Sequence, residues 1–311
     1  MGLALTVAGF IIMSPDGLLI RSVGLGSWSL AFWRCVLVAL VLTGFVLLRS
    51  GHRGALLQFR AIGRIGLLVA GFSAVANLCF VQSMTHTDVA STLVIVSVSP
   101  LFAAVLSRIF LGERVAPITW TAIGVVVGAT ALIFVGSAGR GDLGGDLVAV
   151  GAALAIAGSA TAIRRGRRVS MMPAIALGNA AAAVVAAPLV DVWVPGPGDL
   201  LPLVAMGVLV LPLAVGMVTS GPRYLPAPEV NLLSLIETVL GPLWVWWVLS
   251  EAPSVQALAG AAIIVPTVLV HSVLAGRWLP TPPGLAEGEA PGVELRVPDG
   301  APGSFGAKAF R

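Results

Sequence analysis

Residues 225–251 read LPAPEVNLLSLIETVLGPLWVWWVLSE, a run apolar and long enough to cross a membrane as one helix. Glu237 lies nine residues after Pro228 in this run. At about 1.5 Å of rise per residue, that spacing places Glu237 roughly 13 Å into a hydrocarbon core about 30 Å thick. An ionisable residue at such a depth faces a bundle interior or a wet cavity rather than lipid. Residues 225–251 therefore predict a helical bundle organised around Glu237.

The composition indicates a polytopic membrane protein. Of the 311 residues, 58% are hydrophobic and 10% are charged, a balance too apolar for a soluble domain. The net charge of +4 does not indicate nucleic-acid binding, because the arginines lie between apolar runs. Cys35 and Cys79 lie inside such runs, so we interpret them as packing residues rather than as a disulfide pair.

Ten apolar segments are long enough to span a bilayer. They cover approximately residues 2–21, 28–48, 64–84, 89–111, 116–137, 143–163, 171–193, 200–220, 228–250 and 255–276. The short connections favour antiparallel neighbours. The sequence therefore predicts an all-α integral membrane protein with ten transmembrane helices. Residues 277–311 are rich in proline and glycine, and we expect them to form a disordered cytoplasmic tail.

Arginine placement predicts that both termini are cytoplasmic. In that orientation the cytoplasmic connections hold Arg49, Arg53, Arg60, Arg64, Arg108, Arg114, Arg164, Arg165, Arg167, Arg168 and Arg223. Arg21 and Arg140 flank connections on the opposite side. Because short cytoplasmic loops retain positive charge, we expect a multi-pass protein of the cell inner (plasma) membrane with this topology.

The apolar segments also divide into two halves of five, residues 1–138 and 139–276. Moving the second half back by 138 residues places Glu251 on Glu113 and Thr238 on Pro100. In both halves an acidic residue ends the fourth segment, and a Gly- and Ala-rich segment follows. Because five is an odd number, successive halves cross the membrane in opposite senses. The sequence thus predicts an inverted repeat, with a substrate site near the midplane between the halves.

Two long runs resemble the ends of EamA domains, as in ten-helix members of the drug/metabolite transporter superfamily. They are SVSPLFAAVLSRIFLGERVAPITWTAIGVVVGATALIF at 97–134 and RYLPAPEVNLLSLIETVLGPLWVWWVLSEAPSVQALAGAAII at 223–264. The stretch from Met13 to Leu42, with Trp33 and Arg34 early in the second segment, is similar to the start of such a domain. The resemblance covers about residues 1–275. It implies a secondary transporter, often an exporter of amino acids or other small metabolites.

The candidate substrate-binding residues are Glu237, Arg34, Asp16, Asn77, Asn231 and Trp33. Asp16 follows Pro15, whose missing N–H kinks a helix and frees a carbonyl group. Arg34 stays charged at ordinary pH and needs a partner inside a bundle. Either Asp16 or Glu237 can supply that counter-charge, and Arg34 can instead bind a substrate carboxylate. A static ion pair and a substrate site are both open interpretations.

Glu237 is the residue that we expect to exchange a proton, or to bind an amine, as the cavity opens to either side. A glutamate permanently hydrogen-bonded to Asn231, Ser234 or another helix is the alternative. Asn77 suits either interhelical hydrogen bonding or ligand contact, and Trp33 is expected to wall the cavity.

Four further residues near the end of the 228–250 segment have expected structural roles. Trp244, Trp246 and Trp247 favour an aromatic belt at the membrane interface. Glu251, like Glu113 in the first half, is expected to cap a helix or to hold a loop.

These observations predict a secondary active transporter of amino acids or other small polar metabolites that works by alternating access, with protons as a candidate coupling ion. Export rather than import is what the resemblance to the EamA domains implies. The sequence has no GxxxxGK[ST], HExxH or GxSxG motif, and its three histidines are scattered, so we expect no ATP site, metal or cofactor. An integral membrane enzyme acting on lipid-linked substrates is the alternative, and it would change a substrate covalently without a gradient. A structural subunit is a third reading, in which neutralising Glu237 destabilises a partner complex. The expected partners are a small molecule and the lipid bilayer; the oligomeric state is left open.

Overall fold

The computed structural model describes residues 2–112, 117–138, 143–166, 170–220 and 227–278. The described residues form helices and short connections, and they contain no strand. The all-α prediction is therefore confirmed for this part of the chain. Most of the predicted tail, from residue 279 onward, lies outside the described residues.

The helices follow the predicted segments in order. In the first half they are α1 (Gly2–Met13), α2 (Asp16–Ser22), α3 (Ser27–Ala61), α4 (Gly63–His86), α5 (Val89–Val96), α6 (Ser99–Leu111) and α7 (Pro117–Ala138). In the second half they are α8 (Leu143–Arg165), α9 (Met172–Ala186), η1 (Ala187–Leu189), α10 (Pro197–Val204), η2 (Ala205–Val210), α11 (Leu211–Ser220), α12 (Ala227–Leu249) and α13 (Val255–Trp278).

Six stretches of the described helices are long and apolar enough to cross a membrane. They are Ser27–Ala61, Gly63–His86, Val89–Phe110, Leu143–Arg165, Met172–Leu189 and Pro197–Val218. Shorter apolar helical runs cover Trp120–Leu132, Ile236–Leu249 and Val255–His271. The protein is therefore a multi-pass membrane protein.

Two segments predicted as continuous helices are broken near a proline. The first break separates α1 from α2 at Ser14 and Pro15, and the hydroxyl of Ser14 donates to the Ile11 carbonyl at 2.8 Å. That carbonyl lies four residues before Pro15, which has no N–H to offer it. The second break separates α5 from α6, shortly before Pro100. Both breaks interrupt the regular backbone hydrogen bonds of a helix inside an apolar segment, as happens where a membrane helix lines a site.

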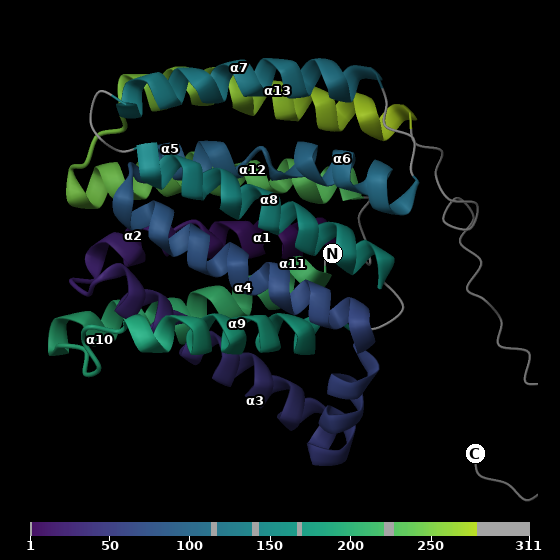
Figure 1. Ribbon diagram of the computed structural model, residues 1–311, viewed down its shortest axis with the longest axis vertical. Coiled ribbons are helices and arrows are strands. Elements are labelled where there is room, and N and C mark those ends of the chain that lie inside the picture. Colours follow the sequence, from purple (N-terminus) through teal and green to yellow (C-terminus); the bar gives the residue numbers. More distant parts are fainter. Residues whose placement is uncertain (1, 113–116, 139–142, 167–169, 221–226, 279–311) are drawn as a thin grey trace, which may run out of the picture. The chain divides into compact units, whose positions relative to one another are not determined.

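Helix α3 is longer than the predicted segment 28–48. Its 35 residues include Gly51, whose φ of +66° marks a kink between two helical parts. Glycine adopts this left-handed conformation without the penalty that a Cβ imposes. Figure 1 shows the end of α3 turning away from its first part. Arg49, Arg53 and Arg60 lie around this turn, where a polar membrane boundary would suit them.

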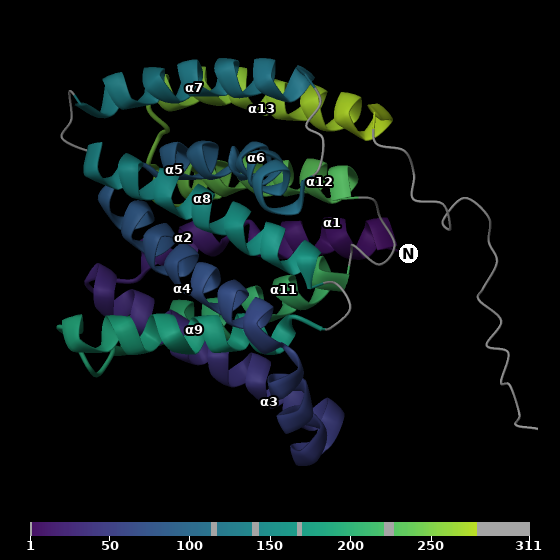
Figure 2. The same cartoon turned by 45° about the vertical axis from the view of Figure 1, so that its right-hand side comes forward.

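The helices of the two halves pack against one another in equivalent pairs. Helix α3 packs on α9, and α7 packs on α13, which lies beside it in Figures 1 and 2. A shift of 138 residues carries α7, residues 117–138, onto 255–276 within α13. The same shift relates the extensive α4–α8 packing to the packing of α11 on α1. This correspondence is the pattern expected of two related halves.

Replacing Gly178 with alanine should destabilise the crossing of α9 over α4. A Cβ at Gly178 would lie 2.7 Å from the Ala70 carbonyl oxygen and 2.7 Å from the Ser73 Cβ. Backbone atoms cannot swing aside, so we expect a loss of about 1–3 kcal/mol, as for other overpacked cores. Thermal unfolding in detergent would measure it. Gly71→Ala is the control, since a Cβ there meets nothing within 4 Å; equal stability of the two variants would contradict the close crossing.

Candidate polar site inside the bundle

A buried ion pair joins the first and second predicted spans. Arg34 Nη2, from α3, lies 2.9 Å from Asp16 Oδ2, at the start of α2. Their side chains are 3% and 1% exposed. Asp16 is brought to this depth by the break at Pro15, because α2 begins at Asp16 itself. Asp16 thus supplies the counter-charge that the sequence left open between Asp16 and Glu237.

Helix α4 holds the other side of the Arg34 guanidinium. Arg34 Nη1 donates to Asn77 Oδ1 at 2.7 Å, and Asn77 Nδ2 donates to the Ser73 carbonyl at 2.9 Å. The ring of Phe80, one turn from Asn77, has its centroid 5.8 Å from Arg34 Cζ, within the range of a cation–π contact. Asp16, Asn77 and Phe80 therefore hold the Arg34 guanidinium in place. Because its donors are already engaged, binding of a substrate carboxylate by Arg34 is the less favoured interpretation.

Two buried polar atoms of the pair have no hydrogen-bond partner among the described residues. They are Asp16 Oδ1 and Arg34 Nε. A buried polar atom without a partner costs about 1–3 kcal/mol, so native proteins rarely leave one unsatisfied. The pair is therefore chemically suited to take up one further polar group, such as a water molecule or part of a ligand.

Glu237 lies near the middle of α12 and is partly buried. Gly241, one helical turn later, has its Cβ position 3.7 Å from the Ser14 carbonyl oxygen and 2.4 Å from Leu93 Cδ1. Residues four apart share a helix face, so Glu237 lies on the side of α12 that faces α1 and α5. It is close enough to interact electrostatically with both Asp16 and Arg34, although neither described ion pair includes it.

Of the two remaining candidates, Trp33 has a described side chain and Asn231 does not. Trp33 is partly buried, and its ring packs edge-on against Phe32 with centroids 5.4 Å apart. Its neighbour in sequence, Arg34, points to Asp16 and Asn77. The side chain of Asn231 lies outside the described residues, so its proposed hydrogen bond with Glu237 stays a prediction.

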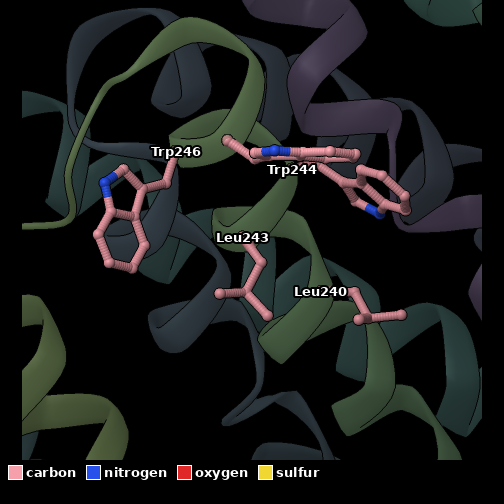
Figure 3. Close-up of a pocket in the computed structure, with 5 residues that line it drawn as sticks. Leu240, Leu243, Trp244 and Trp246 are labelled. Carbon is pink, nitrogen blue, oxygen red and sulfur yellow. The ribbon is translucent and has the colours of Figure 1, made fainter.

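The tryptophans of α12 line an apolar groove whose described walls include neither charge of the ion pair. Figure 3 shows Trp246 on one side of Leu243 and Trp244 on the other. Trp246 and Trp247 are 54% and 79% exposed, which suits the predicted interfacial belt. Trp244 differs, because its indole N–H donates to Ser14 Oγ at 2.9 Å and so ties α12 to the α1–α2 break. Since no ionisable residue is among the described residues that line the groove, we place the candidate site at the buried ion pair instead.

Sequence reasoning missed a polar contact between residues 162 positions apart, Ser29 and Asp191. The Ser29 hydroxyl donates to Asp191 Oδ1, and it accepts the N–H groups of Asp191 and Val192 at 3.2 and 3.1 Å. Asp191 lies in the connection after η1, outside the helices. The Ser29 hydrogen bond, followed by backbone N–H groups at 191 and 192, holds the pKa of Asp191 below its ordinary value. No local pattern in the sequence signals this contact.

The Ser29 contact should make a pH-dependent contribution to stability. Because folding lowers the pKa of Asp191 from about 3.8, the contribution is complete above that value and is lost as the pH falls through the lower folded value. The difference in melting temperature between the wild type and Ser29→Ala should therefore be constant between about pH 7 and about pH 5, and should shrink as the pH falls below about 3.8. A difference that instead grows on acidification would contradict this assignment.

The described helices, their paired packing and the buried polar site define a multi-pass helical membrane protein with an internal charged site. The model of the EamA-like transporter family matches residues 1–135 and 143–273. The chain belongs to this family, and the match confirms the resemblance seen in the sequence. A search of curated protein sequences found no match.

A solved structure has the same fold. Its title reads "Crystal structure of protein", and it is 19% identical to this chain with a TM-score of 0.63. The alignment covers 89% of this chain and 98% of the other. At that identity the likeness supports the fold and does not bear on cargo.

Proposed function

We propose that the protein is a secondary active transporter that exports amino acids or other small polar metabolites by alternating access. The observation that carries the proposal is the Asp16–Arg34 pair, which is almost completely buried within an apolar bundle. Buried ionisable residues are expensive in a membrane and typically mark a substrate or ion pathway. Glu237 lies on α12, near both of these charges, and is the residue proposed to exchange a proton or to bind an amine on the cargo.

The proposed architecture has ten spans arranged as inverted repeats, residues 1–138 and 139–276, followed by a tail. Helix α13 continues two residues into the predicted tail 277–311, as far as Trp278. The six long spans, the shorter apolar helices and the equivalent packing pairs support this architecture. The arginine distribution supports cytoplasmic termini in the cell inner membrane. In this arrangement the two halves rock against each other and expose the buried charges to one side at a time.

The geometry favours one role for Arg34 over another. Asp16, Asn77 and Phe80 already hold its guanidinium, so we assign Arg34 to balancing and positioning Asp16. Asp16 Oδ1 is then the acceptor offered to a further group, and Glu237 is an acid outside the pair. This arrangement of the described charged residues favours a cargo with a hydrogen-bond donor, such as an amine.

The test of function is a comparison of metabolites inside and outside cells that carry the wild-type protein or an empty vector. The expected result is a higher external-to-internal ratio for one class of amine-bearing metabolite in cells with the protein. Transport rates in vesicles with and without an imposed proton gradient then distinguish proton-coupled transport from facilitated diffusion. Covalent change of a compound by purified protein, with no movement of any compound across the panel, would favour the enzyme alternative.

A further inference from the structure

A chain of polar contacts joins four parts of the bundle at one end. We call Arg21, Thr87, Asp146 and Glu251 the polar clamp. Arg21 Nη2 lies 2.8 Å from the Thr87 carbonyl oxygen and 3.1 Å from Glu251 Oε1. The Thr87 hydroxyl donates to Asp146 Oδ1 at 2.8 Å. The clamp thus connects the end of α2, the α4–α5 turn, the first turn of α8 and the residues after α12.

Both side-chain links of the clamp cross between the two halves of the chain. Arg21 and Thr87 belong to the first half, whereas Asp146 and Glu251 belong to the second. The backbones also approach closely here: a Cβ at Gly145 would lie 2.8 Å from Thr87 Cβ and 2.9 Å from the His86 carbonyl carbon. Only glycine fits so near to a neighbouring main chain. The clamp therefore closes a tight seam between the halves.

A hollow beside the clamp, lined by described residues, is too small for a metabolite. Asp88, Val89, Pro242 and Glu251 are among the residues around a small hollow of about 10 Å³. That volume is at most the room that one water molecule requires. Val89 is itself 2% exposed, and its Cγ1 lies 3.0 Å from the Cβ position of Gly17, so these residues pack tightly between the clamp and the start of α2.

We propose that the polar clamp is a gate of the transporter, with Arg21 as its latch on Glu251. The inference rests on the alternating-access function proposed above. Arg21 follows Asp16 by five residues on α2, so the latch lies about 7.5 Å along the helix from the buried pair. The Arg21 and Glu251 side chains are 25% and 37% exposed, so water competes for this pair and makes it easier to open than the Asp16–Arg34 pair. With cytoplasmic termini, the gate faces the exterior.

The test measures how fast a thiol behind the clamp becomes accessible. Val89→Cys is the reporter, in a background with Cys35→Ala and Cys79→Ala, and a membrane-impermeant charged maleimide is added to intact cells. Arg21→Glu should raise the labelling rate about tenfold, as for a shift of an opening equilibrium by that factor. The charge-swapped pair Arg21→Glu/Glu251→Arg should bring the rate back towards the starting value. Labelling after denaturation reports how much reporter protein is present.

Ser22→Glu is the matched control, because it adds an acidic residue to the exposed neighbour of Arg21 and leaves the clamp intact. It should label at the starting rate. Unchanged labelling of Arg21→Glu would overturn the gate, and so would a charge-swapped pair that labels as fast as Arg21→Glu alone. Glu251→Gln provides a milder break if Arg21→Glu does not accumulate. Since labelling needs no cargo, failure of the gate is distinguishable from failure of the transport proposal.

Discussion

Replacing Asp16 with asparagine should destabilise the protein by about 3–5 kcal/mol, the usual cost of breaking a buried ion pair. Arg34 is 3% exposed and stays charged, so the variant would hold an uncompensated guanidinium inside the bundle. Asn77 and Phe80 still contact Arg34, but neither carries a negative charge. The measurement is the melting temperature in detergent, together with the amount of protein in the membrane.

Two matched variants make this result specific. Glu251→Gln breaks the partly exposed pair with Arg21 and should cost only about 0–1 kcal/mol. The double variant Asp16→Asn/Arg34→Gln removes both buried charges, so it should be more stable than Asp16→Asn alone. If Asp16→Asn melted at the same temperature as Glu251→Gln, the buried pair would not be a main support of the fold.

Glu237→Gln should reduce transport by roughly ten- to hundredfold while leaving the protein folded. The range corresponds to losing one charge-assisted hydrogen bond of about 1.5–3 kcal/mol. Glutamine keeps the shape of the side chain but cannot exchange a proton, and no described ion pair includes Glu237. Efflux of the compound identified in the metabolite comparison, at matched membrane abundance, measures the effect.

Glu237→Asp and Val239→Leu are the controls for this prediction. Aspartate keeps an acid on the same face of α12 and should retain part of the activity. Val239 is 49% exposed on α12, and leucine there should leave transport unchanged. Full transport by Glu237→Gln would assign Glu237 to structure and would move the proton or amine site elsewhere.

The two substitutions separate folding from transport. Asp16 has a charged partner at 2.9 Å, so we expect its loss to reduce the stability of the protein first. Neither described ion pair includes Glu237, so we expect its loss to reduce activity first. The proposed mechanism uses both kinds of residue: a fixed charge pair that shapes the site, and an acid that can change its protonation state as the halves move.

The sequence by itself determined the class of fold and the chemistry available to the site. Apolar runs long enough to span a bilayer predicted helices, because a backbone in lipid must satisfy its own hydrogen bonds. Pro15 signalled irregularity, and Asp16, Arg34 and Glu237 were recognisable because charges in such runs are costly. These inferences depend on local composition and spacing, which a single sequence contains.

Only the tertiary structure decided which charged residues meet. Arg34 pairs with Asp16 rather than with Glu237 because the α1–α2 break brings Asp16 against α3, while α4 supplies Asn77 from the other side. Arg21 and Glu251 meet across 230 residues because the ends of α2 and α12 lie together. A long arginine side chain can reach several helices, and the sequence does not predict which helix places an acceptor within hydrogen-bond distance of it. Helix packing makes that choice, since the arrangement that best fills the bundle sets the distances between its charges.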